Sequence, residues 1–225
     1  MDAEAEAGLV AVMTLSEDAR TLWQTAEALA LKALAVSPSA RPLPPLLFFT
    51  DPARSPDPLA TAACLPPGAG VVYRHFGADN ATEVAQALRI ATRETGVRLL
   101  IGRDAGLAEQ VGADGVHLPE RDLHRARDLR RPHPGWLITG AAHGEDALLG
   151  ATGLDAAIVS PVFRAGGASA SRPELGLARL AAMCRRAPCP VYGLGGITPA
   201  NVDQLIGTGI CGIAGVDAFQ AAFGT

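Results

Sequence analysis

Two glycine-bearing segments in the last part of the chain have the composition of an anion site. One is the Gly195-Gly196 pair in VYGLGGITP, and the other spans residues 212–217 and includes Gly215 and Val216. Backbone without side chains lets an anion approach closely, and free N–H groups can donate hydrogen bonds to it. This pattern predicts a phosphate-binding site. The alternative is that the glycines only permit tight turns.

A polar Gly/Ser loop at residues 163–173 follows an apolar run and has Arg164 and Arg172 near its ends. Long loops of this kind often cover a bound ligand, and the two guanidinium groups can close on an anion. The alternative is a surface excursion without a role in binding.

Eight apolar runs alternate with helical patterns, and this alternation predicts the elements that position these loops. The runs are 46–50, 70–76, 98–102, 115–118, 137–142, 156–163, 191–195 and 212–216. Helical patterns fall at 81–95, 105–111, 121–130, 145–150, 175–186 and 199–207, with a weak one at 58–65. Strands alternating with helices indicate parallel βαβ units, and eight of them favour an α/β (β/α)8 TIM barrel over an open doubly wound sheet.

An extra N-terminal helix precedes the barrel. Residues 18–36 show helical spacing of apolar side chains, Ser16 is a suitable cap, and Pro38 favours an end to the helix. We therefore divide the chain into an N-terminal helix with a proline-rich connector at 1–45 and a barrel at 46–225.

Composition excludes several classes of protein. The 225 residues carry a net charge of −4 without a basic stripe, so nucleic acid is not an expected partner. No apolar run approaches the length of a membrane span, and the acidic N-terminus does not resemble a signal peptide. The four cysteines form no CxxC pair. These features favour a cytoplasmic protein with reduced thiols.

In a (β/α)8 barrel the functional residues lie at the carboxyl ends of the strands. That rule selects a short set of polar residues from the whole chain. They are Thr50, Asp51, Arg74, His75, Arg103, Asp104, residues 117–122, His143 and residues 160–171, which begin with Ser160.

Four motifs in order resemble the thiamine phosphate synthase/TenI family over residues 46–223. They are GADGVHL at 112–118, SPVF at 160–163, Gly176-Leu177 and PVYGLGGI at 190–197. The resemblance implies a barrel that joins an aminopyrimidine pyrophosphate to a thiazole phosphate or, in the TenI branch, tautomerises the thiazole phosphate.

The synthase pattern is only partly present. Its Gln-x-Arg-x-Lys stretch corresponds to Val72, Arg74 and Phe76, so only the arginine remains. Arg103 stands where the family has a magnesium ligand, while Asp122 matches the second ligand. One carboxylate beside a guanidinium is a poor Mg²⁺ site. No cofactor is therefore assigned, and Mg²⁺ at Asp122 stays an alternative.

The TenI pattern fits better. It needs no metal and uses a histidine after the fifth strand, which corresponds to His143. A neutral imidazole suits proton transfer at a heterocycle carbon. Asp217 departs from the family's serine in the phosphate loop, and its carboxylate would repel a phosphate unless it caps the last helix.

Three functions remain. The first is a TenI-like enzyme for a small phosphorylated heterocycle, with His143 as acid/base and Arg74, Ser160, Gly195, Gly196, Gly215 and Val216 binding the ligand. The second is a magnesium-dependent synthase with rearranged ligands. The third is a non-catalytic binding or interaction protein. Assembly into a homo-oligomer is left open.

Overall fold

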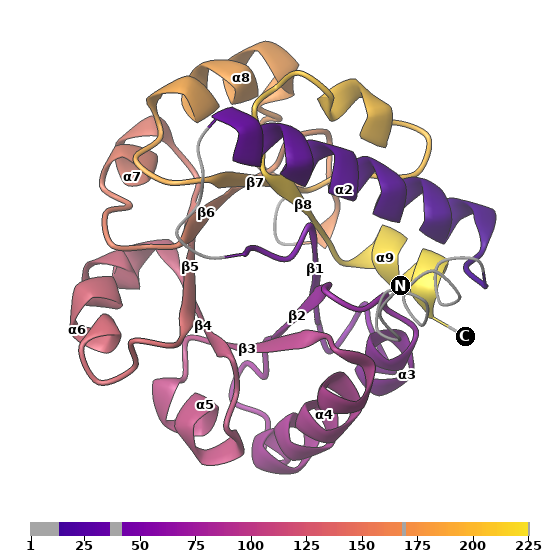
Figure 1. Ribbon diagram of the computed structural model, residues 1–225, viewed down its shortest axis with the longest axis vertical. Coiled ribbons are helices and arrows are strands. Elements are labelled where there is room, and N and C mark those ends of the chain that lie inside the picture. Colours follow the sequence, from indigo (N-terminus) through magenta and orange to yellow (C-terminus); the bar gives the residue numbers. More distant parts are fainter. Residues whose placement is uncertain (1–13, 37–41, 168–169, 225) are drawn as a thin grey trace.

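The computed structural model is a closed barrel of eight parallel strands in sequential order, β1 to β8 (Figure 1). It describes residues 14–36, 42–167 and 170–224. The strands are β1 (Leu46–Phe49), β2 (Gly70–Tyr73), β3 (Arg98–Gly102), β4 (Gly115–Leu118), β5 (Leu137–Ala142), β6 (Ala156–Val159), β7 (Val191–Leu194) and β8 (Gly212–Gly215). Closure comes from β1 pairing with β8, with Leu47 opposite Ala214. The predicted (β/α)8 barrel is confirmed.

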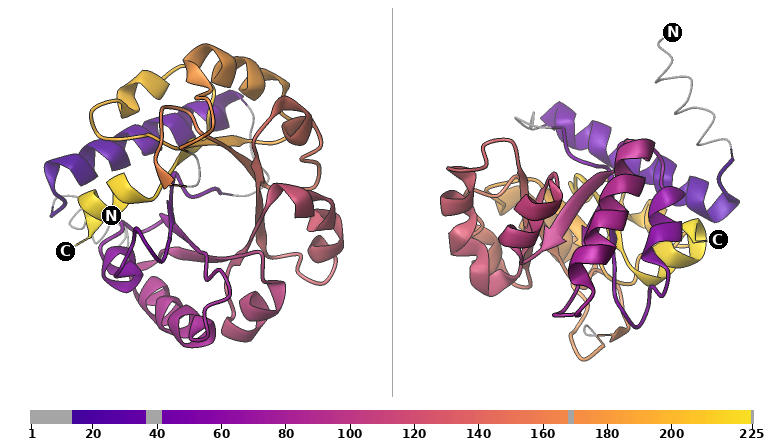
Figure 2. Two further views of the ribbon diagram at one scale, coloured as in Figure 1. Left: turned by 180° about the vertical axis from the view of Figure 1, so that it is seen from behind. Right: turned by 90° about the horizontal axis from the view of Figure 1, so that it is seen from below.

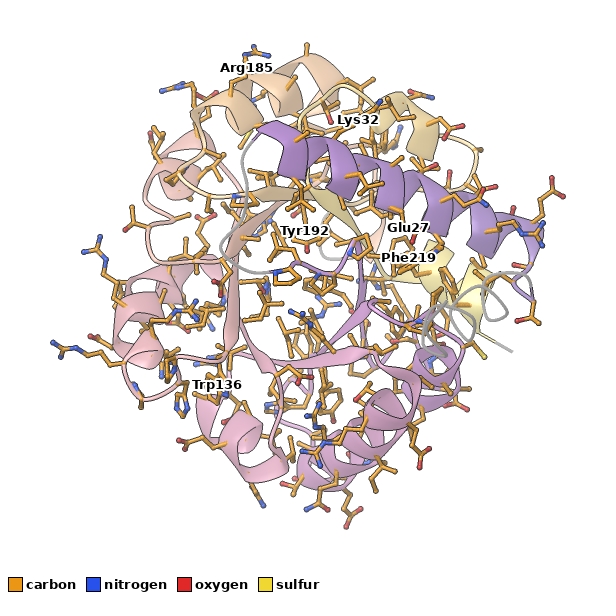
Figure 3. The ribbon with its side chains drawn as sticks, viewed as in Figure 1. Glu27, Lys32, Trp136, Arg185, Tyr192 and Phe219 are labelled. Carbon is orange, nitrogen blue, oxygen red and sulfur yellow. The ribbon has the colours of Figure 1, made fainter. Side chains whose placement is uncertain are left out.

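Alternate side chains of each strand enter two separate apolar cores. One core fills the barrel and includes Leu47, Val72, Leu100 and Tyr192, the last visible within the ring of strands in Figure 3. The other, larger core lies between the strands and the surrounding helices. Because both faces of each strand are buried, the strands are apolar runs without a polar alternation.

Short helices follow most strands around the outside of the barrel (Figure 2, left). They are α3 (Pro58–Ala63), α4 (Ala81–Thr95), α5 (Ala105–Val111), η1 (Glu120–Arg125), α6 (Ala126–Arg130), α7 (Glu145–Leu149), α8 (Gly176–Arg186), η3 (Val202–Leu205) and α9 (Asp217–Phe223). No helix in the described ranges is both long and apolar enough to cross a membrane.

The helix predicted at 199–207 is wrong, because only the single 3₁₀ turn η3 forms there. The Asn201 side chain accepts from the Thr198 N–H and donates to the Gly196 carbonyl, which holds the chain in a turn. Gly207 and Gly209 then adopt positive φ, so no helix continues beyond Leu205. Part of the helix predicted at 121–130 is likewise the 3₁₀ segment η1.

The N-terminal helix α2 (Glu17–Val36) packs outside β8, beside η3 and α9, and it crosses this side of the barrel in Figure 1. Ser16 caps it by accepting from the Ala19 N–H, as predicted, and Thr25 donates to Asp203 at the start of η3. Leu22 is fully buried against the barrel. The long helix thus covers the side that η3 is too short to cover. Pro38 lies outside the described residues.

Replacing Leu22 by alanine should lower the free energy of unfolding by about 2 to 5 kcal/mol, because a fully buried leucine leaves a cavity. Urea unfolding monitored by circular dichroism measures the change. Leu31→Ala on the exposed face of the same helix is the matched control, since Leu31 is 68% exposed. Equal effects of the two substitutions would show that α2 is not part of the packed barrel.

Candidate functional site

His117 lies inside the barrel near the carboxyl ends of the strands. Its ring packs edge-on against Phe49, with ring centres 4.9 Å apart, and Nδ1 lies 3.0 Å from the Thr139 hydroxyl. Burial, reinforced by the charges of Arg74 and His143, lowers the pKa of His117 to about 3. The imidazole is therefore neutral at physiological pH and helps to order the top of the barrel.

Arg74 enters the same space from the end of β2 and is held on several sides. Its Nε donates to the Thr50 carbonyl at 2.8 Å, and its backbone N–H donates to the Thr50 hydroxyl. The guanidinium carbon lies 5.4 Å from the ring centre of Phe49 and 5.3 Å from that of Phe76. This aromatic sandwich orients a fixed positive charge at the mouth of the barrel.

His75 is directed away from this space, as strand alternation after Tyr73 and Arg74 requires, and Asp104 contacts it there. His75 Nε2 lies 3.7 Å from an Asp104 carboxylate oxygen, and the other Asp104 oxygen caps α5 by accepting from the Leu107 N–H. Asp104 is therefore occupied in the packing of the β3–α5 loop.

His143 follows β5 and meets residues from two neighbouring loops. Its Nδ1 lies 3.2 Å from the Ser160 hydroxyl, and its backbone N–H donates to the Glu120 carboxylate at 2.5 Å. Burial and the charge of Arg172 lower the pKa of His143, against the opposing effects of Glu120 and of hydrogen bonding to Ser160. The structure thus holds a neutral, partly accessible imidazole with a fixed ring orientation, which is the form that can accept a proton.

The glycine pair after β7 has a clear steric requirement. Gly195 and Gly196 adopt φ of +97° and +69°, and a Cβ on Gly196 would lie 2.5 Å from the Arg164 carbonyl oxygen. The β6–α8 loop bonds directly to the pair, with the Phe163 N–H donating to Gly195. In the described residues, the N–H groups of Gly196, Val216 and Asp217 have no protein acceptor. The glycine pair is therefore closely packed against the β6–α8 loop, and backbone N–H donors are available in the two glycine loops.

Asp217 is the first residue of α9 and follows the N-cap position Val216. It accepts from the Arg54 guanidinium at 3.2 Å, and Arg54 also contacts Asp51 at 3.0 Å. Asp51 in turn lies 3.4 Å from Arg74. Charges of alternating sign thus run along the rim of the barrel. The carboxylate that would repel a phosphate is paired with a guanidinium.

The carboxylates near the mouth do not fit a magnesium ion that bridges a pyrophosphate. An Asp122 carboxylate oxygen lies 3.8 Å from Nε of Arg103, a residue whose φ is +69°. The Asp104 carboxylate already accepts the hydrogen bond that caps α5. Among the described residues no group of three or more His, Cys, Asp or Glu side chains is arranged to hold a metal. The assignment of Asp122 as a Mg²⁺ ligand stays a prediction.

Two cavities, of about 470 and 510 Å³, open at the opposite end of the barrel. The larger is lined by apolar residues and by Cys184, Cys189 and Cys211. Burial raises the pKa of the Cys184 thiol to about 12 and that of Cys189 to about 11, so both stay protonated. Unreactive thiols at the amino ends of the strands agree with a structural role for this end.

The fold is a TIM barrel whose candidate site lies in the loops at the carboxyl ends of its strands. The family model described as thiamine monophosphate synthase (TMP-TENI) matches residues 48–219. The chain therefore belongs to this family.

Three known proteins illustrate the similarity. The chain is 35% identical over 174 residues to a thiamine-phosphate synthase of Herpetosiphon aurantiacus, covering 75% of this chain and 84% of that protein. It is 34% identical over 141 residues to a putative thiamine-phosphate synthase of Geobacter sulfurreducens, covering 62% and 66%. It thus spans just under two thirds of the Geobacter protein. The structure titled thiamine phosphate pyrophosphorylase from Pyrococcus furiosus has a TM-score of 0.67 at 23% identity, over 79% of this chain and 91% of that one.

The structure brings Arg74, His143 and Ser160 to one mouth and places the two glycine loops at the same end. Sequence reasoning missed Arg54 and the contact of Glu120 with the His143 backbone. Arg54 follows an expected strand by only a few residues, and the unusual Asp217 after the neighbouring strand is the signal that a compensating cation is needed.

The buried His117 should make stability depend on pH. Its pKa is about 3 in the fold against an ordinary 6.5, so the unfolded chain binds the proton first as the pH falls. The associated stability is fully present above pH 6.5 and is lost progressively from there down to about pH 3. Between pH 7.5 and pH 5 the loss amounts to about 2 kcal/mol.

His117→Gln, which keeps a polar partner for Thr139, should remove most of this slope. Urea midpoints at the two pH values measure it, and the exposed His124→Gln variant serves as the control. If His117→Gln and His124→Gln lose the same stability on acidification, the buried neutral imidazole is not the cause.

Proposed function

We propose that this chain is a TenI-like enzyme that acts on a thiazole phosphate or a closely related phosphorylated heterocycle and belongs to thiamine biosynthesis. The observation that carries the proposal is the neutral His143, held by Ser160 and Glu120 at the end of β5. Proton transfer needs such a group, whereas pyrophosphate departure needs a metal and a lysine that this chain lacks at the corresponding positions.

In this proposal His143 removes a proton from a carbon of the bound heterocycle and returns one at another ring position. The product is an isomer, so no cofactor or co-substrate is consumed. Ser160 holds the ring orientation through Nδ1 and leaves Nε2 to face the ligand. Arg74, fixed between two aromatic rings, stabilises negative charge that develops on the heterocycle as the proton leaves.

The phosphate of the ligand occupies the glycine loops after β7 and β8 in this proposal. The free N–H groups of Gly196, Val216 and Asp217 supply donors there, and Gly215 keeps the β8 loop free of a side chain. Phosphate-binding sites at the loops after strands seven and eight are frequent in TIM barrels. It anchors the heterocycle over the mouth, where His143 and Arg74 lie.

Thiamine phosphate synthesis is a second candidate, because the curated relatives carry that name. The contacts within the site argue against it. Phe76 replaces a charged residue beside Arg74, and Arg103 lies beside Asp122, the remaining carboxylate at a ligand position. A purified-protein assay with an aminopyrimidine pyrophosphate, a thiazole phosphate and Mg²⁺ should give no thiamine phosphate. Formation of that product at a rate above the metal-free control would establish the synthase.

Replacing His143 by glutamine should slow exchange of solvent deuterium into the thiazole phosphate by about 10²- to 10⁴-fold, the usual contribution of a general acid–base group. The exchange rate follows from NMR of the ligand in D₂O. Because the pKa of His143 is lowered, wild-type exchange should persist below pH 6.5 and fall only as the pH drops through that lowered value. Affinity for the ligand should change little.

Ser160→Ala is the companion variant, and His133→Gln is the control because His133 stacks on Trp136 outside the mouth. Ser160→Ala should slow exchange less than His143→Gln does, since it only loosens the ring. If exchange is unchanged in His143→Gln, the assignment of His143 fails. If wild-type protein binds the ligand without any exchange, the chain is a binding protein.

A further inference from the structure

Arg54 occupies a rigid turn between β1 and α3. The Arg54 and Ser55 N–H groups both donate to the Asp51 carbonyl, and the Asp51 N–H donates to the Ser55 hydroxyl at 2.6 Å. The Asp51 carboxylate accepts from the Ala53 N–H as well as from the guanidinium. These bonds fix both the backbone and the base of the Arg54 side chain, so its direction does not depend on a bound ligand.

The guanidinium of Arg54 reaches the place where three loops meet. It bonds to Asp217 at the start of α9, and a Cβ added to Gly167 in the β6–α8 loop would lie 2.9 Å from its central carbon. The β6–α8 loop is also the one that bonds to Gly195. The right-hand view of Figure 2 shows this orange loop extending beyond one end of the barrel. Arg54 therefore contacts the loop after β8 directly and lies against the β6–α8 loop, which in turn bonds to the glycine pair after β7.

The charges around Arg54 explain why it stays in this position without a ligand. Burial lowers its pKa, but the hydrogen bond and charge of Asp51 and the charge of Asp217 outweigh that effect and raise it. Asp51 shows the reciprocal balance: burial raises its pKa, and Arg54 and Arg74 bring it below its ordinary value. The two acids balance the two arginines on this rim. A dianionic phosphate would add negative charge next to Asp217, and among the described residues Arg54 is the cation paired with that carboxylate.

We propose that Arg54 is a direct phosphate ligand of this site and that Asp217 holds it in place until the phosphate arrives. The inference rests on the proposed function only for the location of the phosphate at the β7 and β8 loops. A guanidinium has five donors, so Arg54 can keep its bond to Asp51 while it turns a second edge toward the phosphate. Asp217 thereby lowers affinity for phosphate and pairs with the Nη1 group of Arg54, while Nη2 stays bonded to Asp51.

The test is a double-mutant cycle with Arg54→Gln and Asp217→Asn, using inorganic phosphate as the probe in calorimetric titrations. Arg54→Gln should weaken phosphate binding by about 10- to 100-fold, as expected for loss of a charge-assisted bidentate bond. Asp217→Asn should strengthen it by about 3- to 10-fold, because the competing carboxylate is removed. Arg127→Gln, an exposed arginine on α6, is the matched control and should change nothing.

The double variant decides the role of Arg54. As a direct ligand, Arg54 still contributes when Asp217 is neutral, so Arg54→Gln/Asp217→Asn should bind phosphate at least 5-fold more weakly than Asp217→Asn alone. If the two bind equally, Arg54 only neutralises Asp217 and the proposal is overturned. Arg54→Lys, which keeps the charge without the planar fork, should fall between wild type and Arg54→Gln; a loss as large as that of Arg54→Gln accompanied by a lower unfolding midpoint would indicate a structural role.

A second ligand pair separates this inference from the proposed function. Arg54→Gln should weaken binding of the thiazole phosphate but leave binding of the unphosphorylated thiazole alcohol unchanged. If the deuterium exchange assay fails while this selective loss is observed, the catalytic proposal falls and the phosphate ligand stands. Equal weakening of both compounds, or no binding of phosphate to the wild type, overturns the role of Arg54.

Discussion

Closure of the eight parallel strands decides which side chains of this protein can meet. In a closed barrel each strand must direct alternate residues toward the axis. The register between β1 and β8 fixes which residues of these two strands lie side by side where the barrel closes. Arg74 and His117 point into the barrel under this constraint, while His75 points out to Asp104. Residues that are far apart in the sequence become one polar mouth because the strand ends share one edge.

Residues of the family motifs form hydrogen bonds that pack neighbouring βα units together. The SPVF segment bonds to Leu194 and Gly195 on one side and to Leu175 and Gly176 on the other. Asp114 of GADGVHL accepts from the Leu99 N–H and from Arg89. These motifs interlock neighbouring βα units, so they persist in a chain whose ionic groups at the mouth have changed. A match to the motifs therefore identifies the family more securely than the reaction.

The mouth itself is a balanced arrangement of charges. Asp51 contacts both Arg54 and Arg74, and Asp217 contacts Arg54, so no acid in this series is left without a partner. Arg103 and Asp122 form another pair of opposite charges, in the loops after β3 and β4. Pairing of this kind lowers the cost of placing several charges in a partly buried space. His143 lies at the same mouth, where burial and the charge of Arg172 lower its pKa and favour the neutral imidazole.

The sequence by itself determined the barrel, the order of its strands and the position of the glycine loops, because apolar periodicity and glycine placement are local signals that act within one βα unit. It also indicated that Arg74 and His75 could not share a face. Only the tertiary structure shows that Asp217 pairs with Arg54, that Asp104 lies beside His75 and that Glu120 supports the His143 backbone. Those partners come from different βα units. Arg54 and Asp217 meet because β1 pairs with β8, and the other partners meet because neighbouring strands end at the same edge. No spacing within one βα unit encodes a contact between separate units.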